Sequence, residues 1–136
     1  MTPTRSCEIY IDGASRGNPG PASVGVVMKD GTGTRRAFAH YLGETTNNVA
    51  EYLAFVYALQ EALQAGYTAV TVKTDSELLA RQVNGQYKVR DAQLRLFHDV
   101  ARHLMRGFVR CSIEHIPRAQ NAAADRLAGQ AVKHRQ

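Results

Sequence analysis

A buried-strand pattern that runs directly into one acidic residue sets the first condition on the fold. Ile9, Tyr10 and Ile11 favour an extended, largely buried segment, because branched and aromatic side chains pack well in sheets. Asp12 follows them, and the glycines and prolines of 13–21 then predict the end of the strand and a tight loop. A buried carboxylate needs a hydrogen-bond donor, water or a cation, since an unpaired charge is costly to bury. Taken singly, Asp12 is better explained by turn capping.

The order of the remaining patterns predicts an α/β fold. Two further strand patterns at 23–29 and 35–42 are joined by turn residues, so the first three strands form an antiparallel meander. Helix and strand patterns then alternate, at 48–65, 69–74, 75–83, 94–105, 110–116 and from 121 onward. The order strand, helix, strand places 69–74 parallel to the first strand. We therefore expect a five-stranded mixed sheet with helices on its faces.

The bulk composition indicates a globular protein with a single domain, residues 1–136. Hydrophobic residues make up 44% and charged residues 21% of the chain, and no apolar run approaches the ~20 residues of a membrane span. The first residues lack the apolar block of a signal peptide, so we expect a cytoplasmic protein with no membrane partner. The net charge of +5 favours a polyanionic partner, although a run of basic residues is usually only a solvated face.

Four acidic residues occupy positions that would bring them together in such a sheet: Asp12, Glu51, Asp75 and Asp125. Asp12 and Asp75 end the two parallel strands, and ligands of parallel sheets gather at those ends. Glu51 and Asp125 lie in the first turns of helices, where the helix dipole supports negative charge. Clustered carboxylates repel unless divalent cations neutralise them, and all-oxygen ligands select Mg²⁺ or Mn²⁺. Two ions about 4 Å apart are the usual apparatus for in-line phosphodiester hydrolysis. The alternative is four unrelated surface or capping acids.

The chain resembles type 1 ribonuclease H in four segments that occur in the family's order: IDGASRGNPGPASVGVV, TTNNVAEYLAFVYAL, VKTDSELLARQVNGQYKVR and NAAADRLA. The resemblance covers nearly the entire chain and implies the ribonuclease H-like fold, with strand order 3-2-1-4-5. It also implies that Asp12, Glu51, Asp75 and Asp125 are the catalytic, metal-binding acids, with two Mg²⁺ ions per site and Mn²⁺ as a second supporting ion. The activity implied is endonucleolytic cleavage of the RNA strand of an RNA–DNA hybrid, which leaves a 5′-phosphate and a 3′-hydroxyl.

The resemblance further implies a set of substrate-binding residues: Asn18, Thr46, Asn47, Asn48, Glu77, Asn84, Lys88 and Arg90. The asparagines at 18, 47 and 48 match positions that contact the hybrid in its minor groove, where an amide can both donate and accept hydrogen bonds. Thr46 matches a position that holds a phosphate of the DNA strand, and Lys88 and Arg90 would meet backbone phosphates. A plainer interpretation exists for each, with TTNN as a helix cap and the residues at 77, 84, 88 and 90 as solvated side chains.

The chain departs from many family members at two joins. The loop in IPRAQNAAAD is short and lacks the histidine that assists proton transfer or product release in relatives, so that role is vacant or filled by water or another group. His115 lies within a strand pattern and is better explained as a packed or hydrogen-bonded imidazole than as a catalyst. The join NGQYKVRDAQL lacks the extra helix and the basic protrusion of other relatives. Both features resemble compact variants, some of which also cut RNA duplexes.

Three functions are therefore compared. The first is metal-dependent cleavage of RNA–DNA hybrids by a monomer. The second is the same chemistry on double-stranded RNA or on RNA–DNA junctions, and the third is a noncatalytic module that binds hybrids. The intact acids at 12, 51, 75 and 125 argue against the third, because clustered carboxylates that face phosphates do not help a pure binder. The sequence leaves the first two open.

Overall fold

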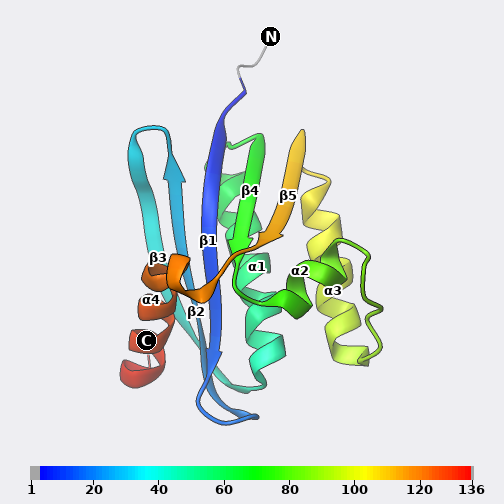
Figure 1. Ribbon diagram of the computed structural model, residues 1–136. Coiled ribbons are helices and arrows are strands. Elements are labelled where there is room, and N and C mark those ends of the chain that lie inside the picture. The colour runs from blue at the N-terminus through cyan, green and yellow to red at the C-terminus, as the bar shows by residue number, and fades with distance from the viewer. Residues whose placement is uncertain (1–3, 136) are drawn as a thin grey trace.

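Five strands form one mixed sheet in the computed structural model, which describes residues 4–135 (Figure 1). The strands are β1 (Ser6–Ser15), β2 (Gly20–Asp30), β3 (Gly33–Thr45), β4 (Ala69–Thr74) and β5 (Arg110–His115). Their order in the sheet is β3-β2-β1-β4-β5, which confirms the expected order. The first three strands pair antiparallel, whereas β4 pairs parallel to β1 and β5 pairs parallel to β4.

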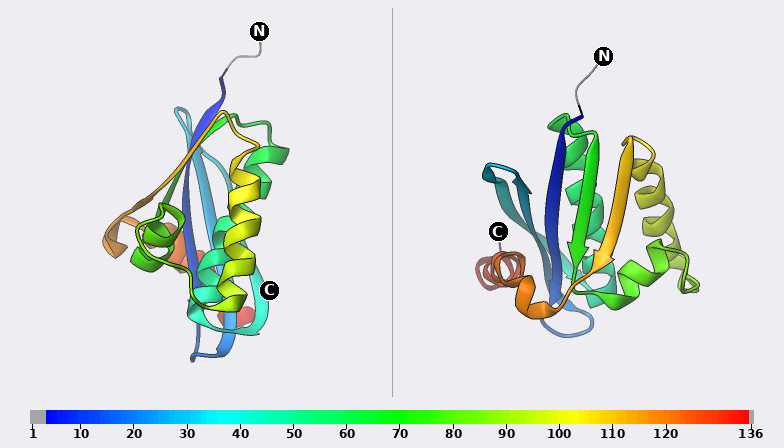
Figure 2. Two further views of the ribbon diagram at one scale, coloured as in Figure 1. Left: turned by 90° about the vertical axis from the view of Figure 1, so that its right-hand side faces the viewer. Right: turned by 45° about the horizontal axis from the view of Figure 1, so that its top comes forward.

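Helices cover both faces of the sheet: α1 (Asn47–Gln64), α2 (Glu77–Val83), α3 (Ala92–Met105) and α4 (Ala122–His134). On one face α1 packs on β1 and β2, with α3 beside it, and on the other face α4 packs over β2, β1 and β3 (Figure 2). A short 3₁₀ helix, η1 (Arg118–Gln120), leads from β5 into α4. None of the described helices is long and apolar enough to cross a membrane.

The core lies between the sheet and α1. Ile9 and Ile11 of β1 are fully buried, as expected for alternate residues on a covered face of a strand. From α1, Tyr52, Phe55 and Leu59 fill the same layer, at the spacing of three and four residues that keeps side chains on one side of a helix. This layer holds the helix face that carries Glu51 against the middle of the sheet.

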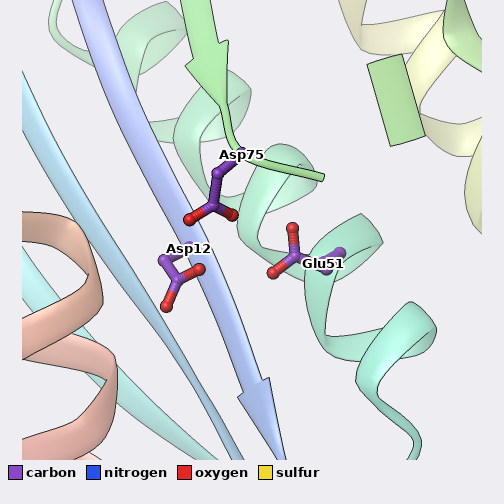
Figure 3. A group of neighbouring side chains, drawn as sticks. All are labelled: Asp12, Glu51 and Asp75. Atoms are coloured by element: carbon purple, nitrogen blue, oxygen red, sulfur yellow. The ribbon is translucent and has the colours of Figure 1, made fainter. Parts of the chain in front are cut away.

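β1 is longer than its sequence pattern predicted. The expectation that the strand ends at Asp12 is wrong, because β1 continues to Ser15 in antiparallel pairing with β2. The parallel pairing with β4 does end here, with Ile11 opposite Thr74. Asp12 and Asp75 are therefore the first residues beyond the last β1–β4 pair, which places their side chains next to each other (Figure 3).

Two glycines let helices approach this point from both faces of the sheet. A Cβ on Gly13 would lie 2.2 Å from the carbonyl carbon of Ala50 in α1, and a Cβ on Gly25 would lie 2.2 Å from the carbonyl oxygen of Ala124 in α4. Gly25 is the register partner of Asp12, so both residues lie on the face that α4 covers. Consecutive strand residues point to opposite faces. The end of the β1–β4 pair is therefore reached by α1 from one side and by α4 from the other.

Candidate metal centre

Three carboxylates from separate elements converge at the end of the β1–β4 pair (Figure 3). Asp12 comes from β1, Glu51 from the second turn of α1, and Asp75 from the residue that follows β4. One oxygen of each carboxylate lies within 4.8 Å of the others. Figure 3 shows the three side chains directed into one shared space. The expectation that these acids meet is confirmed.

Asp125 faces the same pocket from α4 but lies outside the group of three. Its side chain is 40% exposed, and its Oδ1 lies 3.5 Å from the guanidinium of Arg118. The pocket is open and has a volume of about 270 Å³. Beside the four acids, Asn47, Ser76 and Arg118 are among the residues that line it. The pocket therefore gathers side chains from both faces of the sheet.

Burial and mutual repulsion make two of these carboxylates hard to ionise. Asp12 is 5% exposed and Glu51 is 4% exposed. Burial, followed by the charges of Asp75 and Asp125, raises the pKa of Asp12 to about 8, against a smaller opposing effect of Arg118. Burial, followed by the charge of Asp12, also raises the pKa of Glu51 well above its ordinary value. A positive charge placed among these groups would lower the pKa values of both carboxylates.

The donor set fits a hard divalent cation. Glu51 Oε1 accepts a 2.7 Å hydrogen bond from the N–H of Gly13, which fixes the carboxylate against β1. The other oxygen, Oε2, is buried and has no hydrogen-bond partner among the residues that the structure describes. A buried carboxylate oxygen is costly unless something binds it. Carboxylate oxygens this close together suit Mg²⁺ or Mn²⁺, which prefer oxygen ligands to thiolate or imidazole.

The predicted substrate residues near the start of α1 lie beside the pocket. Asn47 lines the pocket, and its N–H donates a 3.1 Å hydrogen bond to Oδ1 of Asn18 in the loop between β1 and β2. Thr46 is the N-cap of α1, since its Oγ1 accepts a 3.2 Å hydrogen bond from the N–H of Val49. For Thr46, the helix-cap interpretation of TTNN is therefore correct. Asn48 is exposed in the first turn of the helix.

The other predicted substrate residues lie along α2 and the loop after it, and none of them lines the carboxylate pocket. Glu77 accepts a 2.9 Å hydrogen bond from Nε of Arg81, and both side chains are exposed. Asn84 donates through Nδ2 to a β5 carbonyl at 3.1 Å, and so it ties the end of α2 to the sheet. Lys88 and Arg90 are exposed in the loop 84–91. The structure thus separates this group from the acids.

Arg118 is a pocket residue that the interpretation of the sequence missed. It lies in the short join between β5 and α4 and lines the pocket. A single basic residue in IPRAQNAAAD was the available signal, but a lone arginine predicts nothing by itself. His115 was expected to be packed or hydrogen-bonded, and the first alternative is wrong, because this residue ends β5 and is exposed. A terminal residue of a strand at the edge of the sheet has no covering layer.

The chain is similar to several known proteins. A family model described as reverse transcriptase-like matches residues 10–131. Ribonuclease HI of Halobacterium salinarum is 44% identical over 124 residues, which are 90% of this chain and 62% of that protein, so the chain spans less than two thirds of this relative. The crystal structure of RNase H1 from the same archaeon has a TM-score of 0.92 at 42% identity and covers 95% of this chain and 98% of that chain. The crystal structure of LC11-RNase H1 in complex with an RNA/DNA hybrid has a TM-score of 0.89 at 41% identity, covering 94% and 97%.

Proposed function

Because the chain belongs to the type 1 ribonuclease H family and has its α/β fold, we propose that it hydrolyses the RNA strand of RNA–DNA hybrids. The products would be a 5′-phosphate and a 3′-hydroxyl. One observation carries the proposal, namely that oxygens of Asp12, Glu51 and Asp75 lie within 4.8 Å of one another in an open pocket. A protein that only binds a polyanion gains nothing from three acids that face its phosphates. The hybrid bound to LC11-RNase H1 supports the substrate class.

We assign divalent cations, two Mg²⁺ or Mn²⁺ ions per site, to Asp12, Glu51, Asp75 and Asp125. When bound, such ions supply the Lewis acidity that favours attack of water on phosphorus and departure of the 3′ oxygen. The chain holds its carboxylates ready for this task. Gly13 fixes one oxygen of Glu51 at 2.7 Å and leaves the other for a ligand. Repulsion among the acids, which raises the pKa of Asp12, disfavours a site without positive charge.

Arg118 takes the place of the absent loop histidine in this proposal. Its side chain is 81% exposed and lies 3.5 Å from Asp125, so it is placed to contact a phosphate in the pocket. A guanidinium offers several donors to phosphate oxygens and has no acceptor with which to take a proton from water. We therefore assign it to orientation of the phosphate. Arg118→Ala should lower kcat about 100-fold, whereas Arg118→Lys should retain part of the rate.

Substrate recognition is assigned to residues beside the pocket and after α2: Asn18, Thr46, Asn47, Asn48, Lys88 and Arg90. The amides of the three asparagines suit the 2′-hydroxyls and base edges of a wide, shallow minor groove. The start of α1 suits a phosphate of the DNA strand, because the N-terminus of a helix carries partial positive charge. The bases at 88 and 90 suit other backbone phosphates. Glu77 and Asn84 stay predictions as substrate contacts, and each already has an intramolecular partner.

The test is a cleavage assay on an RNA–DNA hybrid, a double-stranded RNA and a double-stranded DNA of one sequence, each with Mg²⁺, Mn²⁺ or a chelator. We expect cleavage of the RNA strand of the hybrid with either ion and none with the chelator. Asp75→Asn should abolish cleavage and leave the fold intact. Asp30→Asn removes the same charge at the opposite end of the sheet and is the matched control (Figure 1).

Two outcomes would contradict the proposal. Turnover by Asp75→Asn at the wild-type rate, or cleavage that does not need a divalent cation, would refute the assignment of the site. Faster cleavage of double-stranded RNA, or cleavage confined to RNA–DNA junctions, would keep the chemistry and replace the substrate. The RNA duplex is included in the assay because the two short joins of this chain resemble those of compact variants, some of which also cut RNA duplexes.

A further inference from the structure

A pocket beside the loop between α2 and α3 lies apart from the carboxylates, and Asn84 is the only predicted substrate residue among those that line it. Its volume is about 430 Å³, which is larger than that of the carboxylate pocket. Its walls are the end of α2, Tyr87 and Val89 of the loop, and one side of α3. Figure 1 and the left view of Figure 2 show this loop running beside α3. The lining combines apolar groups with guanidinium groups, so it suits a ligand that carries both a flat ring and an anion.

The pocket is held in place by hydrogen bonds to the core. Gln82 is 6% exposed, and its Oε1 accepts a 2.6 Å hydrogen bond from the hydroxyl of the buried Tyr52. Its Nε2 donates to the carbonyl of Lys88 at 3.2 Å, which ties the loop next to Tyr87 to the core. Arg102 donates from Nη1 to the carbonyl of the last α2 residue at 3.0 Å. The walls on α2, α3 and the loop are therefore joined to one another before any ligand binds.

One side of α3 presents basic groups to this pocket. Arg95, His98 and Arg102 follow one another at spacings of three and four residues, so they share one side of the helix, and all three line the pocket. Arg95 and Arg102 are exposed, and each guanidinium offers several N–H donors. Asp99 also lines the pocket, with a side chain that is 83% exposed. The lining thus contains two guanidinium groups and only one carboxylate, which is solvated. This balance of charge favours an anion.

Tyr87 gives the same pocket an aromatic wall. The residue is 45% exposed, and the guanidinium of Arg81 lies 5.3 Å from its ring centroid. An exposed ring beside guanidinium groups is typical of proteins that bind single-stranded nucleic acid, because a base stacks on the ring while cations hold the backbone. A base inside a duplex is already stacked on its neighbours. A base inside the duplex is therefore not free to stack on this ring, whereas an unpaired base is.

We propose that this pocket binds an unpaired nucleotide of a single strand that continues from the end of the hybrid. The proposal rests on the proposed function, since the strand belongs to the same substrate. The base would stack on Tyr87, and its phosphate would lie against Arg95 and Arg102. α2 leads from the carboxylates to the pocket, and its length of about 10 Å corresponds to roughly three base-pair steps (Figure 1). Such a contact would direct cleavage to the ends of hybrids, where pairing gives way to single strand.

Binding is measured with Asp75→Asn, which should hold the substrate without cutting it. The ligands are one short blunt hybrid and the same hybrid with a single-stranded extension at each strand end in turn. We expect at least one extension to tighten binding by about 5- to 150-fold, the range for one base that stacks on an aromatic side chain. The same extension built from abasic nucleotides should lose most of that gain, because the phosphates remain while the base is gone.

Substitutions in the pocket show which side chains produce the gain in affinity from the single-stranded extension. Tyr87→Ala should remove most of the gain, and Tyr87→Phe should keep it because the ring is retained. Arg95→Ala should reduce both the gain and its dependence on salt, since one phosphate contact is lost. Arg106→Ala removes the same charge just after α3, outside the pocket, and is the matched control. Far-ultraviolet circular dichroism of each variant checks the fold.

The outcomes separate this proposal from the proposed function. A gain that survives Tyr87→Ala, or the absence of a gain from every extension, would overturn the pocket while the proposed function stands, provided that the blunt hybrid is bound and cut. An equal loss of affinity for blunt and extended hybrids in Tyr87→Ala would assign the pocket to the duplex and also overturn the proposal. Failure to bind any hybrid would overturn both.

Discussion

Replacing Asp12 by Asn should stabilise the protein when divalent cations are removed, and the gain should increase with pH. Burial and the neighbouring acids raise the pKa of Asp12 from 3.8 to about 8 in the folded protein, whereas in the unfolded chain it stays near the ordinary ~3.9. Between these two values the folded protein keeps a proton that the unfolded chain has lost. The free energy of unfolding therefore falls as the pH rises through this range, and the loss is complete above the folded pKa.

The size of the effect follows from the shift. Each pH unit between the two pKa values costs at most about 1.4 kcal/mol, so the wild-type protein loses on the order of 4 kcal/mol between pH ~4 and pH 7. Asn has no proton to lose in this range, so the free energy of unfolding of Asp12→Asn does not decrease in this way. It brings a buried amide whose unmet hydrogen bonds cost about 1 to 2 kcal/mol. We expect a net gain on the order of 2 kcal/mol at pH 7 and almost none at pH 5.

The assay is urea unfolding in a chelator at several pH values from 5 to 8, for the wild type and Asp12→Asn. Asp99→Asn is the control, because it removes a carboxylate that is 83% exposed. Its stability should follow that of the wild type at every pH. A difference between Asp12→Asn and the wild type that stays constant with pH, or an equal gain in Asp99→Asn, would refute the reasoning. Added Mg²⁺ should reverse the order, since the wild type regains its ligand.

Three further predictions test the approach of α1, the phosphate contacts and the minor-groove contact. Gly13→Ala should destabilise the fold by about 3 kcal/mol and abolish cleavage, because its Cβ would overlap the backbone of α1; Gly31→Ala, which has open space around it, is the control, and equal melting temperatures would contradict this. Lys88→Ala and Arg90→Ala should each lower the salt dependence of hybrid binding by about one counterion, and an unchanged slope would remove the residue from the interface. Asn48→Ala should lower kcat/KM about tenfold on a continuous RNA strand, and less on a strand with 2′-deoxy substitutions beside the cut. If those substitutions impair both proteins equally, Asn48 does not contact that hydroxyl.

Local patterns in the sequence were sufficient to order the strands and helices. The strand predicted at 69–74 agrees with β4 residue for residue. The helix predicted at 48–65 is α1, with Thr46 as its N-cap and Gly66, at φ 84°, directly after its C-cap. Each of these features depends on residues within a turn or two of the chain. Periodicity and capping also act over a turn or two of the chain, which is why these elements could be predicted from the sequence.

Element ends that depend on a distant partner could not be predicted in this way. β1 runs through Asp12 to Ser15 because β2 continues to pair with it, and that pairing involves residues after the loop. The join at 117–120, expected as a loop, contains η1 and carries Arg118 into the carboxylate pocket. The short join offered no pattern from which the direction of this side chain could be read.

The order of the elements was enough to predict that Asp12, Glu51, Asp75 and Asp125 stand at ends that a mixed sheet brings together. What each carboxylate meets could be read only from the folded chain: Gly13 binds one oxygen of Glu51, the other is buried without a partner among the described residues, and Asp125 pairs with Arg118. The pocket between α2 and α3 likewise exists only in the folded chain. The physical reason is that these contacts join residues far apart in the chain, so their distances depend on how closely helices pack on both faces of the sheet.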